Sequence, residues 1–142
     1  MTPYQIKLVK SSWAIVGKID PVTVGGLFYN RVFEIAPEAR NMFHKPIEEQ
    51  SRKLLVTLSF IISKLDRLDE IVSEVVKLAK RHINYGVKPA HYAIVGEALL
   101  WTLEKGLTEQ WNDELKQAWT DCYTILSNAM IEAAEYTELD AA

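Results

Sequence analysis

Hydrophobic residues recur every three or four positions along the chain, which is the spacing that gives an α-helix one apolar face. No segment shows the sustained alternation of apolar and polar residues that is typical of a β-strand. We therefore predict an all-α protein with six long helices and one short helix. The sequence contains no repeat and no long linker, so we expect one domain over residues 1–142, with a tail that frays from about residue 137.

Capping residues and prolines mark where the predicted helices begin. Thr2, with Gln5 three positions later, forms a capping box before the first helix, which should end near residues 17–19. Later helices are predicted to begin at Asp20-Pro21, at Pro37 for the short one, at Pro46, after residues 66–69, at Pro89 and at Thr108. Gly86 should stop the helix before Pro89. Gly25 and Gly26 lie inside a helix, where each costs up to about 1 kcal/mol, so we expect another helix to cross close to them.

Three polar or titratable side chains fall on the apolar faces of different helices. His82 is four positions after Leu78, Gln50 is four positions before Leu54, and Tyr29 lies on the apolar face of the second helix. Each has an ordinary interpretation on its own. His82 could be a core histidine bound to a backbone carbonyl, Gln50 a helix-start residue half in solvent, and Tyr29 a packing ring whose hydroxyl reaches a carbonyl.

Composition and charge exclude several classes of function. The net charge of −3 and the pI of about 5.6 give no basic footprint for nucleic acid. No apolar run reaches the roughly 20 residues of a membrane span, and the first residues do not form a signal peptide, so we expect a cytoplasmic protein. The single cysteine, Cys122, excludes an internal disulfide, a cysteine-based zinc site, an iron–sulfur cluster and covalently attached haem.

The familiar catalytic motifs are also missing from the sequence. His44, His82 and His91 lack the spacing of a helical zinc pair, and there is no nucleophile elbow and no phosphate-binding glycine loop. His44 and His91 are expected on the surface. Phe43, in contrast, lies between helices, where a large aromatic side chain should cover something.

Three stretches of the chain resemble bacterial globins. They are LFYNRVFEIAPEARNMF at residues 27–43, QSRKLL at 50–55 and KRHINYGVKPAHYAIVGEALL at 80–100. The resemblance is to the globin domains of flavohaemoglobins and to single-domain globins of the Hell's Gate type, and it covers nearly the whole chain. It implies a globin fold around noncovalently bound haem b.

The resemblance also implies roles for particular residues. His82 matches the proximal histidine that binds haem iron, with its other ring nitrogen held by a carbonyl near Leu78. Tyr29 and Gln50 match the distal pair that stabilises bound O₂, and Phe43 matches the corner phenylalanine that packs on the porphyrin. The remaining pocket candidates are Leu54, Tyr85, Val87, Tyr92 and Val95.

The function implied is reversible binding of O₂, NO and CO at ferrous iron, with high O₂ affinity, in O₂ scavenging or nitric oxide detoxification. One alternative is a nitric oxide dioxygenase that works with a separate reductase, since the 142 residues include no flavin or nicotinamide domain. A gas sensor or redox protein is a second alternative, and a haem-free helical interaction protein is the plainest one. The sequence departs from the flavohaemoglobin pattern at the proximal glutamate, where Ala134 stands between Glu132 and Glu135.

Overall fold

The computed structural model describes the backbone of residues 1–141 and the side chains of residues 1–135, and this part of the chain contains helices and no strand. The α-helices are α1 (Pro3–Val16), α2 (Pro21–Ile35), α3 (Ile47–Ser63), α4 (Val72–Asn84), α5 (Pro89–Leu107) and α6 (Asp113–Ala141). The short 3₁₀ helices are η1 (Pro37–Met42), η2 (Leu65–Ile71) and η3 (Thr108–Gln110). The predicted all-α fold is confirmed. The backbone of α6 continues through the stretch for which the sequence predicts fraying.

Local capping explains most of the helix starts. The Thr2 hydroxyl accepts a hydrogen bond from the Gln5 N–H at 3.1 Å, and the Gln5 side chain accepts one from the Thr2 N–H at 3.1 Å. The Asp20 carboxylate accepts a hydrogen bond from the Val22 N–H at 3.1 Å. At the end of α4, Gly86 adopts a φ of +84°, a left-handed conformation that glycine takes without a steric penalty. These are the caps and the stop that the sequence predicts.

The predicted start of the last helix at Thr108 is wrong. Thr108 follows the end of α5 at a φ of 49°, and α6 begins at Asp113, where the Asn112 side chain accepts a hydrogen bond from the Leu115 N–H at 2.9 Å. Asn112 therefore supplies the cap that the sequence predicts at Thr108. The link between α3 and α4 is itself helical, because residues 65–71 form η2.

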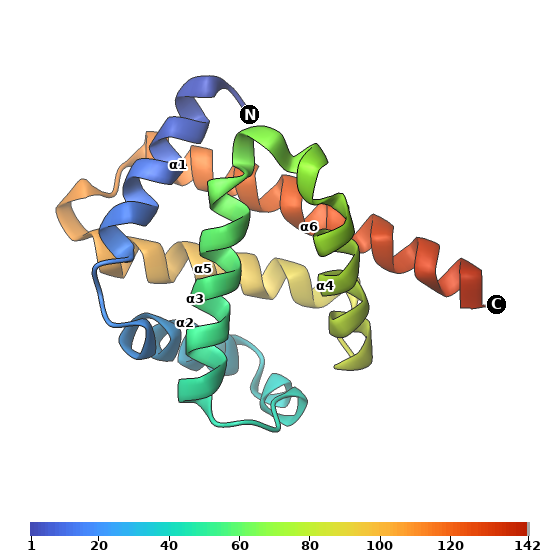
Figure 1. Cartoon of the computed structure of the whole chain (residues 1–142). Coiled ribbons are helices and arrows are strands. Elements are labelled where there is room, and N and C mark those ends of the chain that lie inside the picture. Colours follow the sequence, from blue (N-terminus) through green and yellow to red (C-terminus); the bar gives the residue numbers. More distant parts are fainter. Residues whose placement is uncertain (142) are drawn as a thin grey trace.

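Two layers of helices organise the molecule (Figure 1). In this view α3 and α4 run in opposite directions at the front of the molecule and are joined by η2, while α5 and α6 cross behind them. α2 packs extensively on α3 and α5, and α4 packs on α6. Within the described residues, no packing of similar extent joins α4 to α2, α3 or α5. α4 therefore stands apart from the core that holds α3.

The close approach of α2 and α3 depends on Gly25. A Cβ atom at this position would lie 2.1 Å from the Ser51 Oγ, and Ser51 is fully buried. The expectation of a crossing helix is confirmed for Gly25. It is wrong for Gly26, where a Cβ atom would meet nothing within 4 Å.

No helix in the described part of the chain is long and apolar enough to span a membrane.

Candidate functional site

His82 lies in the last turn of α4, and one of its ring nitrogens has no partner among the described residues. Its Nδ1 is 2.8 Å from the backbone oxygen of Leu78, and because a carbonyl can only accept a hydrogen bond, Nδ1 carries the proton and donates it. Burial lowers the pKa of His82, and the charge of Arg81 lowers it further, although the bond to Leu78 acts in the opposite direction. The ring is therefore neutral near pH 7, and its Nε2 has a lone pair available to a metal ion.

Two aromatic rings lie against the His82 ring, and the backbone that follows α4 is hydrogen-bonded to the histidine's main chain. The ring of Tyr92, on α5, is stacked on the His82 ring with the centroids 6.5 Å apart and the planes 22° apart. The ring of Tyr85 lies edge-on to the His82 ring, with the centroids 6.2 Å apart. The Val87 N–H donates a hydrogen bond to the His82 carbonyl at 3.0 Å, so the turn after α4 is tied back to the histidine. Three of the predicted pocket residues thus surround His82.

Tyr29 lies on α2, at the centre of an aromatic cluster. Only 6% of the residue is exposed, and its ring packs edge-on against the rings of Phe28 and Phe43, with centroid distances of 5.0 and 5.1 Å. Burial raises the pKa of Tyr29 to about 12, so the hydroxyl keeps its proton at physiological pH. Within the described residues that hydroxyl has no hydrogen-bonding partner, in contrast to the hydroxyl of Tyr123. The interpretation of Tyr29 as a packing ring bonded to a carbonyl is therefore not supported.

Gln50, Leu54 and Leu58 form a half-buried face of α3. No hydrogen bond engages the Gln50 side chain in the part of the chain that the structure describes. On α4, Val75 and Leu78 are half-buried as well, and they lie two turns and one turn before His82, respectively. Both faces keep apolar surface exposed because the two helices do not pack closely on each other.

The other predicted pocket residues lie either against the main core, which includes Tyr29, or around His82. Leu54 and Val95 are half-buried and pack against the main core, as does Phe43. Phe43 belongs to the group around Tyr29, whereas Tyr85, Val87 and Tyr92 belong to the group around His82. Among the described residues, no hydrogen bond or ring contact joins the group around Tyr29 to the group around His82.

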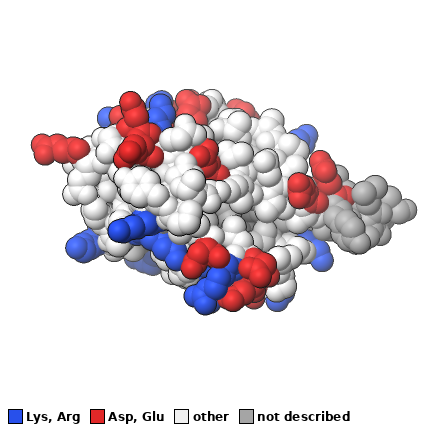
Figure 2. All heavy atoms as spheres, turned by 90° about the horizontal axis from the view of Figure 1, so that it is seen from above, with Lys and Arg blue, Asp and Glu red and all other residues white. Residues whose placement is uncertain are grey.

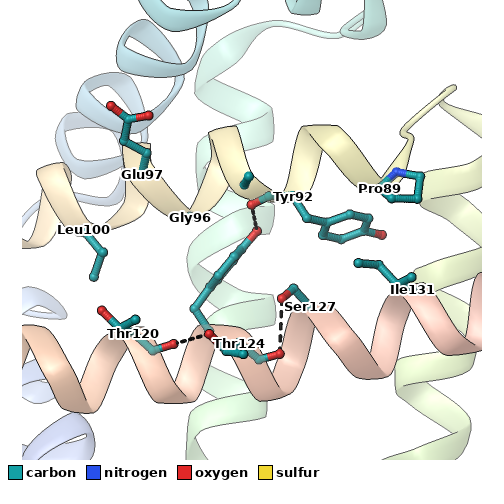
Figure 3. Close-up of a pocket in the computed structure, with 11 residues that line it drawn as sticks. Pro89, Tyr92, Gly96, Glu97, Leu100, Thr120, Thr124, Ser127 and Ile131 are labelled. Carbon is teal, nitrogen blue, oxygen red and sulfur yellow. Dashed lines mark hydrogen bonds between the residues drawn. The ribbon is translucent and has the colours of Figure 1, made fainter.

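Among the residues whose side chains the structure describes, no carboxylate pairs with Tyr92. Its pKa is raised by burial alone, and Glu132 and Glu135 are exposed. The Tyr123 hydroxyl, on α6, instead donates a hydrogen bond to the Tyr92 backbone oxygen at 2.6 Å (Figure 3). A cavity of about 380 Å³ between α5 and α6 adjoins the Tyr92 ring.

The role of Tyr123 was missed by sequence reasoning, although one signal was available. Gly96 lies four residues after Tyr92 on α5, and a Cβ atom there would be 2.7 Å from the Tyr123 ring. The glycine makes room for the ring, and the ring then reaches the backbone one turn earlier.

The other two histidines are not part of the site. His44 is exposed, as expected. His91 is half-buried at the start of α5, where its Nδ1 accepts a hydrogen bond from the Lys88 N–H at 2.9 Å, so it has a capping role that the sequence did not indicate. The described residues contain no group of three His, Cys, Asp or Glu side chains that could hold a metal ion. A metal bound to His82 would need the rest of its ligands from a cofactor, as a porphyrin provides.

Comparison with known proteins gives the family. A family model described as Globin matches residues 26–130. The neuroglobin of Tetraodon nigroviridis is 30% identical over 138 residues, which cover 87% of this chain and 86% of that protein. The flavohemoprotein of Vibrio cholerae is 30% identical over 143 residues, which cover 97% of this chain and 36% of that protein.

The solved structure of a bacterial globin from Campylobacter jejuni is 28% identical, with a TM-score of 0.85 over 96% of this chain and 99% of that one. The matches confirm the resemblance to flavohaemoglobin globin domains and to bacterial globins. The chain belongs to the globin family.

Proposed function

We propose that this chain is a globin that binds haem b through the Nε2 of His82, with Tyr29 and Gln50 on the opposite side of the cofactor. The observation that carries this proposal is the neutral, oriented ring of His82, whose Nδ1 is occupied by Leu78 and whose Nε2 is free. Ferrous haem held in this way binds O₂, NO and CO reversibly. Membership of the globin family supports this choice of cofactor.

Half-buried apolar side chains on α3 and on α4 fit a flat, mostly apolar cofactor placed between the two helices. Leu54 and Leu58 on α3, and Val75 and Leu78 on α4, are half-buried in the protein alone. A porphyrin between the two helices would cover both faces, and burial of apolar surface contributes about 25 cal/mol per Å². In this arrangement Phe43 supplies an aromatic edge beside Tyr29.

The distal residues favour tight retention of O₂. The Tyr29 hydroxyl is held in a buried aromatic cluster and has no partner in the described protein, so it is a preorganised donor for a polar ligand. The Gln50 amide is a second donor on the same side. We propose a role in O₂ scavenging or nitric oxide detoxification in the cytoplasm, rather than in oxygen delivery.

Similarity to the globin part of a flavohemoprotein favours one enzymatic alternative, nitric oxide dioxygenation with electrons from a separate reductase. The matched region is 36% of that protein, so activities of the remainder do not transfer to this chain. Nitrate should form once per ferrous, oxygen-loaded protein after NO is added. With NADH as the sole reductant, turnover should stop after this first round, and sustained consumption of NADH by the purified chain would contradict the requirement for a separate reductase.

The visible spectrum tests the proposed function directly. The chain is purified, titrated with hemin and recorded in its oxidised, reduced and CO-bound forms. A Soret band that saturates at one hemin per chain and shifts on reduction and on CO addition is the expected result. A spectrum that stays that of free hemin would overturn the proposal.

A further inference from the structure

Positive charge is concentrated in two short segments of this acidic chain. Residues 44–53 and 77–88 hold seven of the sixteen Lys and Arg residues and only two of the nineteen Asp and Glu residues. These segments therefore carry a formal charge of +5, whereas the rest of the chain carries −8. The segments are far apart in sequence, but one leads into the α3 residues around Gln50 and the other forms the last part of α4 around His82.

Exposed basic side chains lie just before and on α3, and on α4. Lys45 and Lys53 share the Glu49 carboxylate, with Nζ–Oε1 distances of 3.7 and 4.0 Å, and their side chains are 54% and 56% exposed. The pKa of Lys53 is lowered by its contact with Lys45, by the charge of Lys45 and by burial, whereas the charge of Glu49 raises it and that of Arg81 on α4 lowers it slightly. Lys77 is also exposed and lies one turn before Arg81, on the same side of α4. We refer to Lys45, Lys53, Lys77 and Arg81 as the basic rim.

Few carboxylates neutralise the positive charge of the basic rim. Glu49 is the one carboxylate paired with it in the described residues, and no ion pair engages Lys77 or Arg81 there. Like charges held near one another repel, so an arrangement of this kind favours an anionic partner. With Glu49 the basic rim carries a formal charge of +3, and the two carboxylates of a porphyrin would offset only part of it. On the face shown in Figure 2, by comparison, acidic and basic side chains lie next to one another.

We infer that the basic rim is the docking surface for an electron-donor protein with an acidic face. This inference rests on the proposed function, because a globin that loses an electron during nitric oxide detoxification must be reduced again. The transfer is of one electron, from the reduced flavin or iron–sulfur centre of the donor to ferric haem iron, and it needs no proton and breaks no bond. Tyr85, which is 53% exposed and touches the His82 ring edge-on, gives the rim an apolar contact beside the proximal ligand.

A protein partner agrees better with the charge distribution than an extended polyanion does. Nucleic acid and anionic membranes present negative charge over a wide area, and the charge of −8 on the remainder of the chain would repel them. A compact acidic protein can contact the rim alone. Electrostatic complementarity of this type raises the association rate and makes it sensitive to salt.

The test uses the haem-loaded chain and a reduced, acidic flavodoxin as the probe. Stopped-flow absorbance gives the second-order rate of reduction, and isothermal titration gives binding, both between about 20 and 300 mM ionic strength, a range over which screening changes strongly. The test variant is Lys53→Glu/Lys77→Glu, and the matched control is Lys7→Glu/Lys18→Glu, which makes the same change of charge elsewhere. We expect the rim variant to lose about tenfold or more in both rate and affinity, and the control to stay within about twofold.

Equal effects in the two variants, or a rate that does not depend on salt, would overturn the inference. Binding to duplex DNA or to phosphatidylserine vesicles at salt concentrations where flavodoxin does not bind would overturn it too. Reduction by dithionite, followed by the CO spectrum, is recorded for every variant. If the parent chain gives no haem spectrum, the proposed function fails, whereas a normal spectrum with rim-independent reduction by flavodoxin refutes the docking surface alone.

Discussion

Replacement of Tyr29 by phenylalanine isolates the contribution of one hydroxyl to ligand retention. The ring contacts with Phe28 and Phe43 are kept, and no hydrogen bond to the described protein is lost, so the folded state should be about as stable as the parent. An O₂ molecule on ferrous haem draws electron density and becomes a partly charged acceptor, for which a hydrogen bond contributes about 1.5–3 kcal/mol. Since each 1.4 kcal/mol is about tenfold, O₂ release should accelerate roughly ten- to a hundredfold.

CO is a weaker acceptor, so its release should change much less. Both rates are measured by stopped-flow ligand displacement. Because the pKa of Tyr29 is about 12, the donor stays protonated, and the parent O₂ release rate should be flat from about pH 6 to about pH 10. O₂ release within about twofold of the parent, or equal changes for O₂ and CO, would remove the hydrogen-bonding role from Tyr29.

Tyr123→Phe is the matched control for this experiment. Tyr123 donates a hydrogen bond to the Tyr92 carbonyl at 2.6 Å, and its loss should lower the free energy of unfolding by about 1 kcal/mol with little effect on O₂ release. Tyr29→Phe should therefore change the rate of O₂ release, whereas Tyr123→Phe should change the stability measured by urea denaturation. A Tyr123→Phe variant that released O₂ as fast as Tyr29→Phe would show that both effects arise from general loosening of the site.

Three further predictions concern packing and backbone, and urea denaturation tests each of them. Gly25→Ala should lower the free energy of unfolding by about 1–3 kcal/mol, because its Cβ would overlap Ser51. Gly26→Ala should raise the free energy of unfolding by up to about 1 kcal/mol. A Gly25→Ala variant more stable than Gly26→Ala would contradict the close crossing of α2 and α3. Ser51→Ala should stabilise the protein by about 1 kcal/mol, because the buried Oγ has no partner among the described residues, and a loss of stability would reveal one. Thr108→Gly should stabilise it by about 0.5–1 kcal/mol by relieving the φ of 49°, and an unchanged midpoint would indicate that the threonine is unstrained.

Features encoded within one or two helical turns could be predicted from the sequence. The Thr2 cap and the inward side of α4 both follow from residues that are near one another in the chain. The position of His82 on an apolar face was visible in the same way, and the resemblance to globins gave it a role. The bond from its ring to Leu78, one turn earlier, is local and was also predicted.

Features that depend on how helices meet could not be read from the sequence. The bond from Tyr123 to Tyr92 joins residues on different helices, and it forms only because Gly96 lets α5 and α6 approach. Two adjacent glycines on α2 look alike in sequence, yet only Gly25 faces another helix. The start of α6 was misplaced because Thr108 and Asn112 are both good capping residues, and the choice between them is made by the path of the chain after α5.

Chemical rescue with imidazole shows whether His82 is the protein ligand of the haem iron, as we propose. His82→Gly removes the ring, and free imidazole can then enter the space it leaves, whereas His91→Gly changes a histidine that only caps α5. Hemin titration followed by the reduced and CO-bound spectra is carried out for the parent and both variants, with and without imidazole. We predict that His82→Gly binds hemin weakly, with an altered spectrum, that imidazole restores the parent spectrum, and that His91→Gly matches the parent throughout. Parent-like hemin affinity and spectra in His82→Gly without imidazole would show that His82 is not the ligand of the iron.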